Sequence, residues 1–388
     1  MGLRIWSINS MNVLLLGASG SIGEQTLDIL AENRDRFTLV GFSVGKRSEN
    51  ISLILKKFPS VNSVYLIDEA KKKAFSKAYP SIKFYANDEL ENLVKECDYD
   101  MCVDALVGIS GLVPCIRALE RNKIVCLANK EALVTGGHLV NDLLAKGYGK
   151  LYPIDSEHVA LAKCLSHVKK DEIDKLIITA SGGALREVPF EKLASVTKDD
   201  ALRHPTWNMG AKITIDCATM MNKGFEIIEA YYLYGYGLDK IEVLMHDESL
   251  IHSAIRKKNG LYVCDYSKPD MHNPIRYALF ETKAYQDVVE IDDLRKLNNV
   301  HFREFDPRRY PLVELAKKCL VDGPSKLVAL NGANEIAVNR FLNDEITYFD
   351  IVKIVNKVVE LTPIEKNPSL NRVLEIDKWA REMAKEVR

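Results

Sequence analysis

Residues 12–23, Asn-Val-Leu-Leu-Leu-Gly-Ala-Ser-Gly-Ser-Ile-Gly, join a short apolar strand to a glycine-rich turn, after which a helical pattern runs to about Asn33. Glycines at such a turn let the backbone approach a pyrophosphate, which then lies at the helix N-terminus, where amide N–H groups favour anions. The spacing G-x-x-G-x-x-G also suits a plain tight turn, but its place directly after the first strand favours a nucleotide site. The residues predicted to contact the dinucleotide are Ser19, Gly20, Ser21 and Ile22.

The alternation of apolar runs and helical patterns continues to about residue 150. Further strands are predicted at 37–44, 61–67, 101–106, 124–128 and 150–154. Helices are predicted at 69–78, 111–121 and 130–145. Strands that alternate with helices are typical of an α/β fold with a doubly wound parallel sheet. We therefore predict a Rossmann-like domain over residues 11–150, with residues 1–10 outside it.

The end of the second predicted strand indicates which nucleotide binds. NAD-dependent enzymes usually have a carboxylate there, which bonds the ribose 2′-hydroxyl. This chain instead has Gly45, Lys46 and Arg47, and its two cations would attract the 2′-phosphate of NADPH. We predict that these three residues bind NADPH. A solvated basic turn is the alternative, above all for Arg47.

From residue 176 the pattern changes to strands clustered around one helix. Strands are predicted at 176–179, 213–216, 242–245, 253–256 and 261–264, and a helix at 219–234. This pattern predicts a central α+β catalytic domain over residues 151–297. The polar residues 298–311 are predicted to be a linker. Helical spacing at 312–319, 326–342, 349–361 and 374–388 then predicts a C-terminal helical bundle over residues 312–388.

Composition excludes several classes of protein. With 53 basic and 54 acidic residues among 388, the chain lacks the basic surplus of a nucleic-acid binder. No apolar run approaches the ~18 residues that a membrane span needs. The eight cysteines are scattered without a C-x-x-C pair, which is typical of free thiols in a reducing compartment. We predict a cytoplasmic protein with neither nucleic acid nor membrane as a partner.

Asp155 and Glu157 follow a predicted strand, two residues apart. In extended chain such residues point to the same side, so both carboxylates can converge on one point. Paired acids without cysteine suit a hard divalent ion such as Mg²⁺ or Mn²⁺. We predict Glu226 as the third ligand, because it follows Asn222 by one helical turn. Taken alone, the pair is better explained as a solvated loop.

Lys130 follows a predicted strand at the carboxyl edge of the parallel sheet, where ligands bind in such folds. It could reach the substrate or a metal-bound carboxylate, and a solvated lysine at a helix start is an equally good interpretation. Ser181, Asn222 and Lys223 offer a hydroxyl, an amide and a point charge, which together suit a phosphate.

A loop punctuated by glycine and proline, about residues 183–210, has the character of a lid. Trp207 in this loop would close apolar surface over the substrate. His204 is a candidate for a hydrogen-bonding or proton-handling group, although a lone histidine is more often structural.

Taken together, these motifs resemble the 1-deoxy-D-xylulose 5-phosphate reductoisomerase family. They are GASGSIG at 17–23, ANKE at 128–131, DSEH at 155–158, SGG at 181–183, HPTWNMG at 204–210 and ATMMNKG at 218–224. Shorter motifs at 251–253, 269–271 and 330–335 agree with them. The resemblance runs from about Met11 to the C-terminus.

The resemblance implies an enzyme that rearranges 1-deoxy-D-xylulose 5-phosphate and reduces the product with NADPH to 2-C-methyl-D-erythritol 4-phosphate, in isoprenoid precursor synthesis. It implies Mg²⁺ or Mn²⁺ as the ion, with Co²⁺ as a further option, and a homodimer. The implied metal ligands are Asp155, Glu157 and Glu226. The implied catalytic residues are Lys130, Glu157, His204 and Glu226.

The remaining contacts are also carried over from the family. Those to the substrate's carbon skeleton would come from Lys130, Ser156, Glu157 and Glu226, and those from the lid would come from His204 and Trp207. Those to its phosphate would come from Ser181, Cys217, Asn222 and Lys223. Further contacts to the cofactor would come from Asn129, Glu131 and Gly210.

Three departures from the family pattern stand out. Position 217 is Cys where Ser is usual, and a thiol is the weaker donor to a phosphate. His272 replaces an expected Arg, and residues 254–257 are unusual. These differences concern outer contacts rather than the central chemistry.

Two other functions fit parts of this pattern. A semialdehyde or homoserine dehydrogenase has a similar outline, and the semialdehyde enzyme needs a nucleophilic cysteine, for which Cys126 or Cys217 could be proposed. Neither shows an evident Cys–His arrangement. A module that senses NADPH without turnover is the second alternative, and the carboxylates together with the phosphate-binding residues argue against it.

Overall fold

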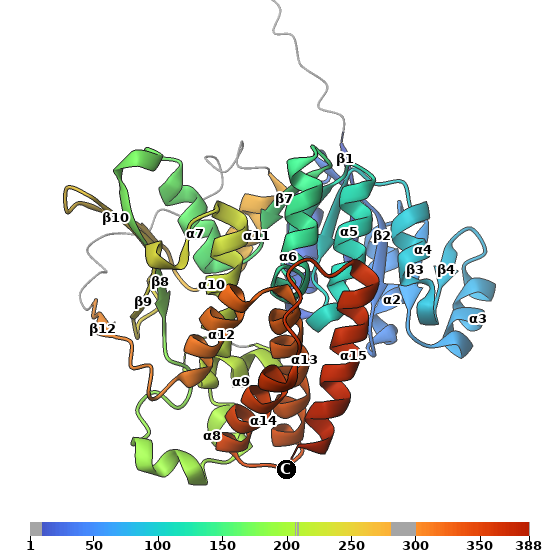
Figure 1. The fold of residues 1–388 in the computed structure, drawn as a ribbon. Coiled ribbons are helices and arrows are strands. Elements are labelled where there is room, and N and C mark those ends of the chain that lie inside the picture. The colour runs from blue at the N-terminus through green and yellow to red at the C-terminus, as the bar shows by residue number, and fades with distance from the viewer. Residues whose placement is uncertain (1–9, 206, 208, 281–299, 388) are drawn as a thin grey trace, which may run out of the picture. The chain divides into compact units, whose positions relative to one another are not determined.

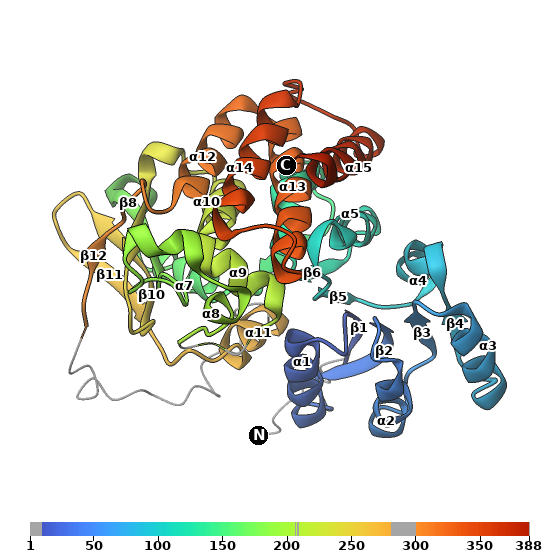
Figure 2. The same cartoon turned by 90° about the horizontal axis from the view of Figure 1, so that it is seen from below.

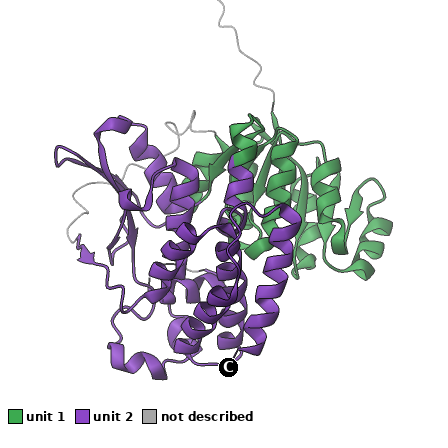
Figure 3. Cartoon of the chain, viewed as in Figure 1, with its two compact units in different colours: residues 1–129, 142–154, 271–285 green, residues 130–141, 155–270, 286–388 purple. Residues whose placement is uncertain are grey.

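The computed structural model describes residues 10–205, 207, 209–280 and 300–387 (Figures 1 and 2). The chain divides into two compact units, coloured separately in Figure 3. Unit 1 comprises residues 1–129, 142–154 and 271–285, and unit 2 comprises residues 130–141, 155–270 and 286–388.

Unit 1 contains a seven-stranded sheet in the order β4-β3-β2-β1-β5-β6-β7, and each pair of neighbours is parallel. Its strands are β1 (Met11–Leu16), β2 (Phe37–Val44), β3 (Ser63–Leu66), β4 (Lys83–Tyr85), β5 (Met101–Asp104), β6 (Ile124–Leu127) and β7 (Lys150–Pro153). The strand order reverses at β1, and ligands bind at such a switch point in open α/β sheets. The prediction of a doubly wound, Rossmann-like sheet is confirmed.

Helices connect the strands of unit 1. They are α1 (Ser21–Glu32), α2 (Ile51–Lys57), α3 (Glu69–Ala78), α4 (Leu90–Glu96) and α5 (Leu112–Glu120). A later helix, α11 (His272–Leu279), packs on α1, and Arg276 on it donates to Glu32 at 2.7 Å. Val13, Leu14, Leu15 and Leu16 of β1 are fully buried, which explains why this strand reads as a continuous apolar run.

Unit 2 contains a five-stranded sheet in the order β11-β10-β8-β9-β12. Its strands are β8 (Ile173–Ala180), β9 (Ile241–Met245), β10 (Ile251–Lys257), β11 (Tyr262–Tyr266) and β12 (Arg303–Glu304). Strands β8 and β9 are parallel, and the other pairs are antiparallel. The two-residue β12 lies in the predicted linker and pairs with β9. The predicted α+β region is confirmed, with this short strand as an addition.

Five helices lie wholly or partly in unit 2 before the C-terminal ones: α6 (Lys130–Ala145, of which residues 142–145 belong to unit 1), α7 (Ser156–Leu165), α8 (Lys198–Ala201), α9 (Ala211–Thr219) and α10 (Met221–Tyr234). Of these, α7 and α10 pack on the sheet. The prediction of a strand at 213–216 is wrong, because these residues lie within α9. Two isoleucines two residues apart, Ile213 and Ile215, fit a strand as well as a helix when the run is this short. Burial of Ile215, Ala218 and Thr219 follows the helical period.

The chain ends in four helices, as predicted. They are α12 (Pro311–Asp322), α13 (Pro324–Leu342), α14 (Tyr348–Leu361) and α15 (Leu370–Glu386). Their apolar faces share one hydrophobic core with Ile215 of α9 and Phe225 of α10. The C-terminal helices are thus packed directly against the helix that carries Glu226.

Among the described residues, no helix combines the length and the apolar character that crossing a lipid bilayer would require.

Candidate active site

The nucleotide turn lies in unit 1, between β1 and α1. Gly17 has a φ of +86°, and a Cβ there would lie 2.4 Å from the carbonyl oxygen of Ala105. A Cβ at Gly23 would lie 2.2 Å from the carbonyl oxygen of Gly17. Both positions therefore require glycine. Gly20 is the N-cap of α1, and within the described residues no side chain caps the first turn, so its N–H groups face the turn.

The basic segment after β2 is exposed at Lys46 and Arg47. The Arg47 guanidinium lies 3.2 Å from the Glu24 carboxylate, and about half of each side chain is exposed. An exposed pair of this kind contributes little to stability. The predicted cofactor residue Asn129 is buried, and its amide donates to the carbonyls of Leu106 and Gly108 at 2.9 and 2.8 Å. Its amide nitrogen therefore holds the loop that follows β5.

Asp155 and Glu157 lie at the start of α7, in unit 2. The predicted extended arrangement is wrong, because Asp155 is the extended N-cap and Glu157 lies in the first helical turn. One carboxylate oxygen of Asp155 accepts from the backbone N–H groups of Glu157 and His158 at 3.0 and 3.1 Å. Aspartate is a strong N-cap residue, which is the sequence signal that could have located this helix.

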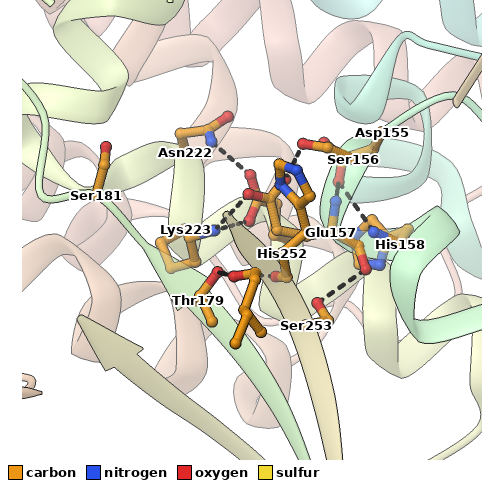
Figure 4. Close-up of polar contacts among 12 residues, drawn as sticks. Asp155, Ser156, Glu157, His158, Thr179, Ser181, Asn222, Lys223, His252 and Ser253 are labelled. Carbon is orange, nitrogen blue, oxygen red and sulfur yellow. Dashed lines mark hydrogen bonds and ion pairs between the residues drawn. The ribbon is translucent and has the colours of Figure 1, made fainter. Parts of the chain in front are cut away.

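The three predicted metal ligands converge in spite of that difference. One oxygen from each of Asp155, Glu157 and Glu226 lies within 4.8 Å of the other two. Glu226 is 1% exposed and accepts from the Asn222 amide, one helical turn away, at 2.5 Å. Figure 4 shows Asp155, Glu157 and Lys223 pointing toward a common centre. The structure thus brings together acids that are separated by about 70 residues in the chain.

Two buried lysines accompany the carboxylates. The Lys130 ammonium lies 3.0 Å from Asp155 Oδ2 and 3.3 Å from Glu226 Oε1. The Lys223 ammonium contacts Glu226 and lies 3.7 Å from Glu157 Oε1. Three carboxylates against two ammonium groups leave an excess of negative charge in a poorly hydrated site. Such a site favours the binding of a cation.

The pKa values reflect this crowding. Burial, together with Glu226 and Asp155, raises the pKa of Glu157 to about 7. Burial alone would also raise the pKa of Asp155, but the Lys130 ammonium outweighs it and holds that pKa well below its usual range. Burial opposes the ammonium form of Lys130, yet Asp155 and Glu226 still raise its pKa well above the ordinary value. Asp155 therefore stays ionised and Lys130 stays protonated at neutral pH, whereas the pKa of Glu157 lies close to neutrality.

The predicted phosphate-binding residues come from three segments. Ser181 follows β8, and the next two residues, Gly182 and Gly183, have φ values of +82° and +67°. A Cβ at Gly183 would lie 2.7 Å from the backbone of Cys217, so the glycine turn rests directly on α9. Among the described residues, the buried Oδ1 atom of Asn222 has no hydrogen-bond partner.

The Cys217 side chain is partly exposed beside this turn. Burial and the nearby Glu226 carboxylate raise the pKa of its thiol to about 12. The thiol is therefore protonated at neutral pH, which makes it a weak donor rather than a nucleophile. Cys126 is fully buried within β6. Neither cysteine has the properties that the semialdehyde dehydrogenase alternative requires.

The predicted lid is anchored along its first half. Leu185, Leu193 and Ala201 are buried in the core of unit 2, and Arg309 donates to the carbonyls of Leu185 and Val188 at 2.5 and 2.7 Å.

His204 and Trp207 lie close to the other predicted ligands. Nδ1 of His204 accepts from the Trp207 N–H at 3.0 Å, and Nε2 lies 3.5 Å from Ser181 Oγ. The Trp207 and His252 rings lie 6.3 Å apart. Burial lowers the pKa of His204, so its neutral form is favoured at neutral pH. His204 can therefore offer a hydrogen bond through Nε2 without carrying charge.

Two predicted cofactor residues of unit 2 have other partners. The Glu131 carboxylate accepts from the Lys212 ammonium at 2.5 Å, and Lys212 also lies 2.8 Å from Asp216. Gly210 is the N-cap of α9, and a Cβ there would meet no atom within 4 Å. Glu131 is thus engaged within its own unit, while Gly210 leaves open space in front of α9.

Sequence reasoning missed several residues that support the carboxylates. Ser253 donates to the Glu157 carbonyl at 2.9 Å (Figure 4). The Glu229 carboxylate lies 3.3 Å from Nε2 of His158, and both side chains are buried. Glu229 follows Glu226 by three residues, so helical spacing could have placed it on the same face.

The unusual residues have a structural explanation. Arg256 and Lys257 on β10 form ion pairs at 2.7 and 3.0 Å with Asp174 and Glu172. They belong to the sheet of unit 2, far along β10 from Ser253. His272 is the first residue of α11 in unit 1.

Comparison with known proteins agrees with this geometry. A family model for 1-deoxy-D-xylulose 5-phosphate reductoisomerase matches residues 13–137, and models of that family's C-terminal domains match residues 151–234 and 266–383. The reductoisomerase 2 of Bacillus thuringiensis subsp. konkukian is 40% identical over 381 residues, covering 97% of this chain and 99% of that protein. The reductoisomerase of Exiguobacterium sibiricum is 40% identical over 376 residues, covering 95% and 97%.

Solved structures give the same result. The reductoisomerase from Zymomonas mobilis in complex with NADPH is 34% identical, with a TM-score of 0.88, covering 97% of this chain and 99% of that one. A reductoisomerase in complex with NADPH, fosmidomycin and magnesium is 30% identical, with a TM-score of 0.89, covering 97% and 98%. The chain therefore belongs to the 1-deoxy-D-xylulose 5-phosphate reductoisomerase family.

Proposed function

We propose that this protein rearranges 1-deoxy-D-xylulose 5-phosphate and reduces the product to 2-C-methyl-D-erythritol 4-phosphate, using NADPH and a divalent metal ion. The observation that carries this proposal is the convergence of Asp155, Glu157 and Glu226 beside two buried lysines. The solved relatives bound to NADPH and to magnesium support the choice of cofactors.

The three carboxylates suit the proposed ion. They supply only oxygen ligands, which Mg²⁺ and Mn²⁺ prefer, and Co²⁺ is compatible with the same donors. A bound divalent ion would polarise the substrate's oxygens and so lower the barrier to cleaving and remaking the adjacent C–C bond. Burial, with a smaller contribution from Glu226 and Asp155, raises the pKa of Glu157, and a bound cation would offset both effects.

Residues of the chain orient the substrate around that point. Lys130 lies against two of the carboxylates and is placed to hold negative charge that develops on a substrate oxygen. Ser156 donates to Glu157 at 2.7 Å, and its hydroxyl is proposed to contact the carbon skeleton. His204 contributes a neutral hydrogen-bonding group from the lid.

The phosphate of the substrate binds at the other end of this cluster. The proposed donors are the hydroxyl of Ser181, the thiol of Cys217, the amide of Asn222 and the ammonium of Lys223. Charge-assisted hydrogen bonds of this kind are stronger than neutral ones, so a few donors can anchor a small ligand. Trp207 would cover the bound sugar with apolar surface.

The cofactor site lies on unit 1. The α1 N-terminus would hold the pyrophosphate through the segment 19–22, and Gly45, Lys46 and Arg47 would receive the 2′-phosphate. Asn129, which follows β6, Glu131 and Gly210 are proposed as further contacts to the cofactor. We further propose a homodimer in the cytoplasm that serves isoprenoid precursor synthesis.

The decisive assay follows NADPH oxidation with 1-deoxy-D-xylulose 5-phosphate, with and without Mg²⁺ or Mn²⁺. We expect metal-dependent oxidation by the wild type and a loss of two or more orders of magnitude in Glu226→Gln. Glu360→Gln, an exposed change on α14, is the matched control and should keep full activity. Oxidation that resists EDTA, or an active Glu226→Gln, would refute the proposed centre.

A further inference from the structure

Lys71, in the first turn of α3, contacts the basic segment that follows β2 in unit 1. Its ammonium donates to the hydroxyl of Ser48 at 2.8 Å, and Ser48 is 5% exposed. Strands β2 and β3 are parallel neighbours, with Val44 paired to Leu66, so the segments after them share one edge of the sheet. Lys71 thereby contacts Ser48, the residue directly after Lys46 and Arg47, although Lys71 lies more than 20 residues later in the chain.

Three acids of unit 1 near these segments have other partners. Asp68 caps α3 by accepting from two of its backbone N–H groups, and Glu69 lies 3.6 Å from Lys72. Glu24 pairs with Arg47. In the part of the chain that the structure describes, the Lys71 ammonium has a neutral hydroxyl as its partner and no carboxylate. Among the described residues of unit 1, its charge is therefore not paired with a carboxylate.

We propose that Lys71 is a specificity-determining residue that binds the 2′-phosphate of NADPH together with Ser48. This inference rests on the proposed function, because it refines the cofactor site of that function. A phosphate monoester carries a charge of about −1.5 to −2 at neutral pH and offers three acceptor oxygens. The Ser48 hydroxyl can donate to one oxygen while the Lys71 ammonium, with two further N–H donors, contacts another.

Lys71 is better suited to this role than Arg47. A phosphate that binds Arg47 must compete with the Glu24 carboxylate, whereas one that binds Lys71 displaces no ionic partner. NADH has a hydroxyl in place of the 2′-phosphate, so it gains nothing from the uncompensated ammonium. The selectivity for NADPH over NADH should therefore depend on Lys71.

The test is fluorescence titration of the full-length protein with NADPH and with NADH. Lys71→Gln keeps a polar side chain of similar length and removes the charge. We expect it to weaken NADPH binding about tenfold, in line with the loss of one charge-assisted contact, and to leave NADH binding unchanged. Lys73→Gln is the matched control on the same helix, because residues two apart face different directions, and it should keep wild-type values.

The outcomes separate the inference from the proposed function. If the wild type prefers NADPH and Lys71→Gln keeps that preference, the inference is overturned while the cofactor assignment stands. If Lys71→Gln weakens both nucleotides equally, Lys71 acts on the fold of the site and the inference is also overturned. If the wild type binds both nucleotides equally, the NADPH assignment fails together with the inference. Lys71→Arg keeps the positive charge that Lys71→Gln removes, so it should retain most of the selectivity for NADPH.

Discussion

At the scale of single residues, the buried carboxylates are held by partners both near and far along the chain. Glu226 accepts a hydrogen bond from Asn222, one helical turn away, and this local spacing can be read from the sequence. For Glu131 the sequence could not show that a lysine 81 positions later would pair with its carboxylate. Contacts of that range depend on the packing of helices that single-sequence patterns do not specify.

Cys217 permits a direct test of the phosphate-binding residues. Because a hydroxyl donates more strongly than a thiol, Cys217→Ser should keep kcat within about threefold and lower the KM for 1-deoxy-D-xylulose 5-phosphate. Steady-state kinetics at saturating NADPH measure both constants. Cys264→Ser, on the exposed strand β11, should change neither. A loss of more than tenfold in kcat for Cys217→Ser would contradict this assignment.

Glu157 makes metal binding depend on pH. Its pKa in the metal-free protein is raised, by burial first, from 4.5 to about 7, and a ligand carboxylate must be deprotonated. Below pH 7 the ion must displace this proton, so the affinity for Mn²⁺ should fall about tenfold per pH unit and level off above pH 7. Calorimetric titration at pH 5.5, 6.5, 7.5 and 8.5 measures the slope.

The same pKa shift makes the free energy of unfolding of the metal-free protein depend on pH. Between pH 4.5 and about 7 the folded protein holds a proton on Glu157 that the unfolded chain has lost, so stability should fall as the pH rises through this window. The pKa of His158 is also raised, against the effect of burial, by Glu229, and this has the same sign. Glu157→Gln is the control for the titrations with Mn²⁺. It should bind Mn²⁺ weakly, and its affinity for Mn²⁺ should depend less on pH. If the wild type's affinity for Mn²⁺ did not change between pH 5.5 and 8.5, this role of Glu157 would be excluded.

At the scale of elements, long periodic segments were predicted well and short ones were not. The strand β1 and the helices α13 and α14 were found because their apolar patterns extend over whole elements. The helix α9 was mistaken for a strand because four residues do not distinguish the two periods. The sequence analysis does not predict the helix α7, which is only 10 residues long and begins at the Asp155 cap.

The glycine turn after β8 should be intolerant of a side chain. Gly183→Ala would force a left-handed alanine and drive its Cβ to 2.7 Å from the Cys217 backbone, which would displace α9. We expect the KM for the substrate to rise at least tenfold. Gly235→Ala is matched in φ, also +67°, and its Cβ would meet no atom within 4 Å. Steady-state kinetics should show that only Gly183→Ala affects substrate binding, and equal KM values would speak against the role of this turn.

At the scale of the whole molecule, the sequence indicated the classes of fold but not how segments combine. Residues 271–285 join unit 1 although most of unit 2 precedes them in the chain. The sequence predicts that the C-terminal helices form a domain of their own. The boundary between that domain and the central one stays a prediction. In the structure they share one core with α9 and α10.

That shared core predicts cooperative unfolding of unit 2. Leu330→Ala in α13 should cost about 2–5 kcal/mol, the usual range for a buried leucine. Leu361→Ala, at a site that is 46% exposed, should cost much less. Trp207 in the lid segment and Trp379 in α15 both belong to unit 2, so urea unfolding can be followed by their fluorescence with circular dichroism in parallel. Separate transitions for the C-terminal helices would contradict a single core.

The position of Asp155 restricts what mutation can accomplish there. One of its oxygens starts α7 and the other faces Lys130, so the same carboxyl group begins a helix and completes a charged centre. Alanine would undo both, whereas asparagine would preserve the cap and remove the charge. A residue at this position must therefore meet two requirements, the helix cap and the negative charge. A defect caused by alanine alone would not reveal which of the two requirements had been broken.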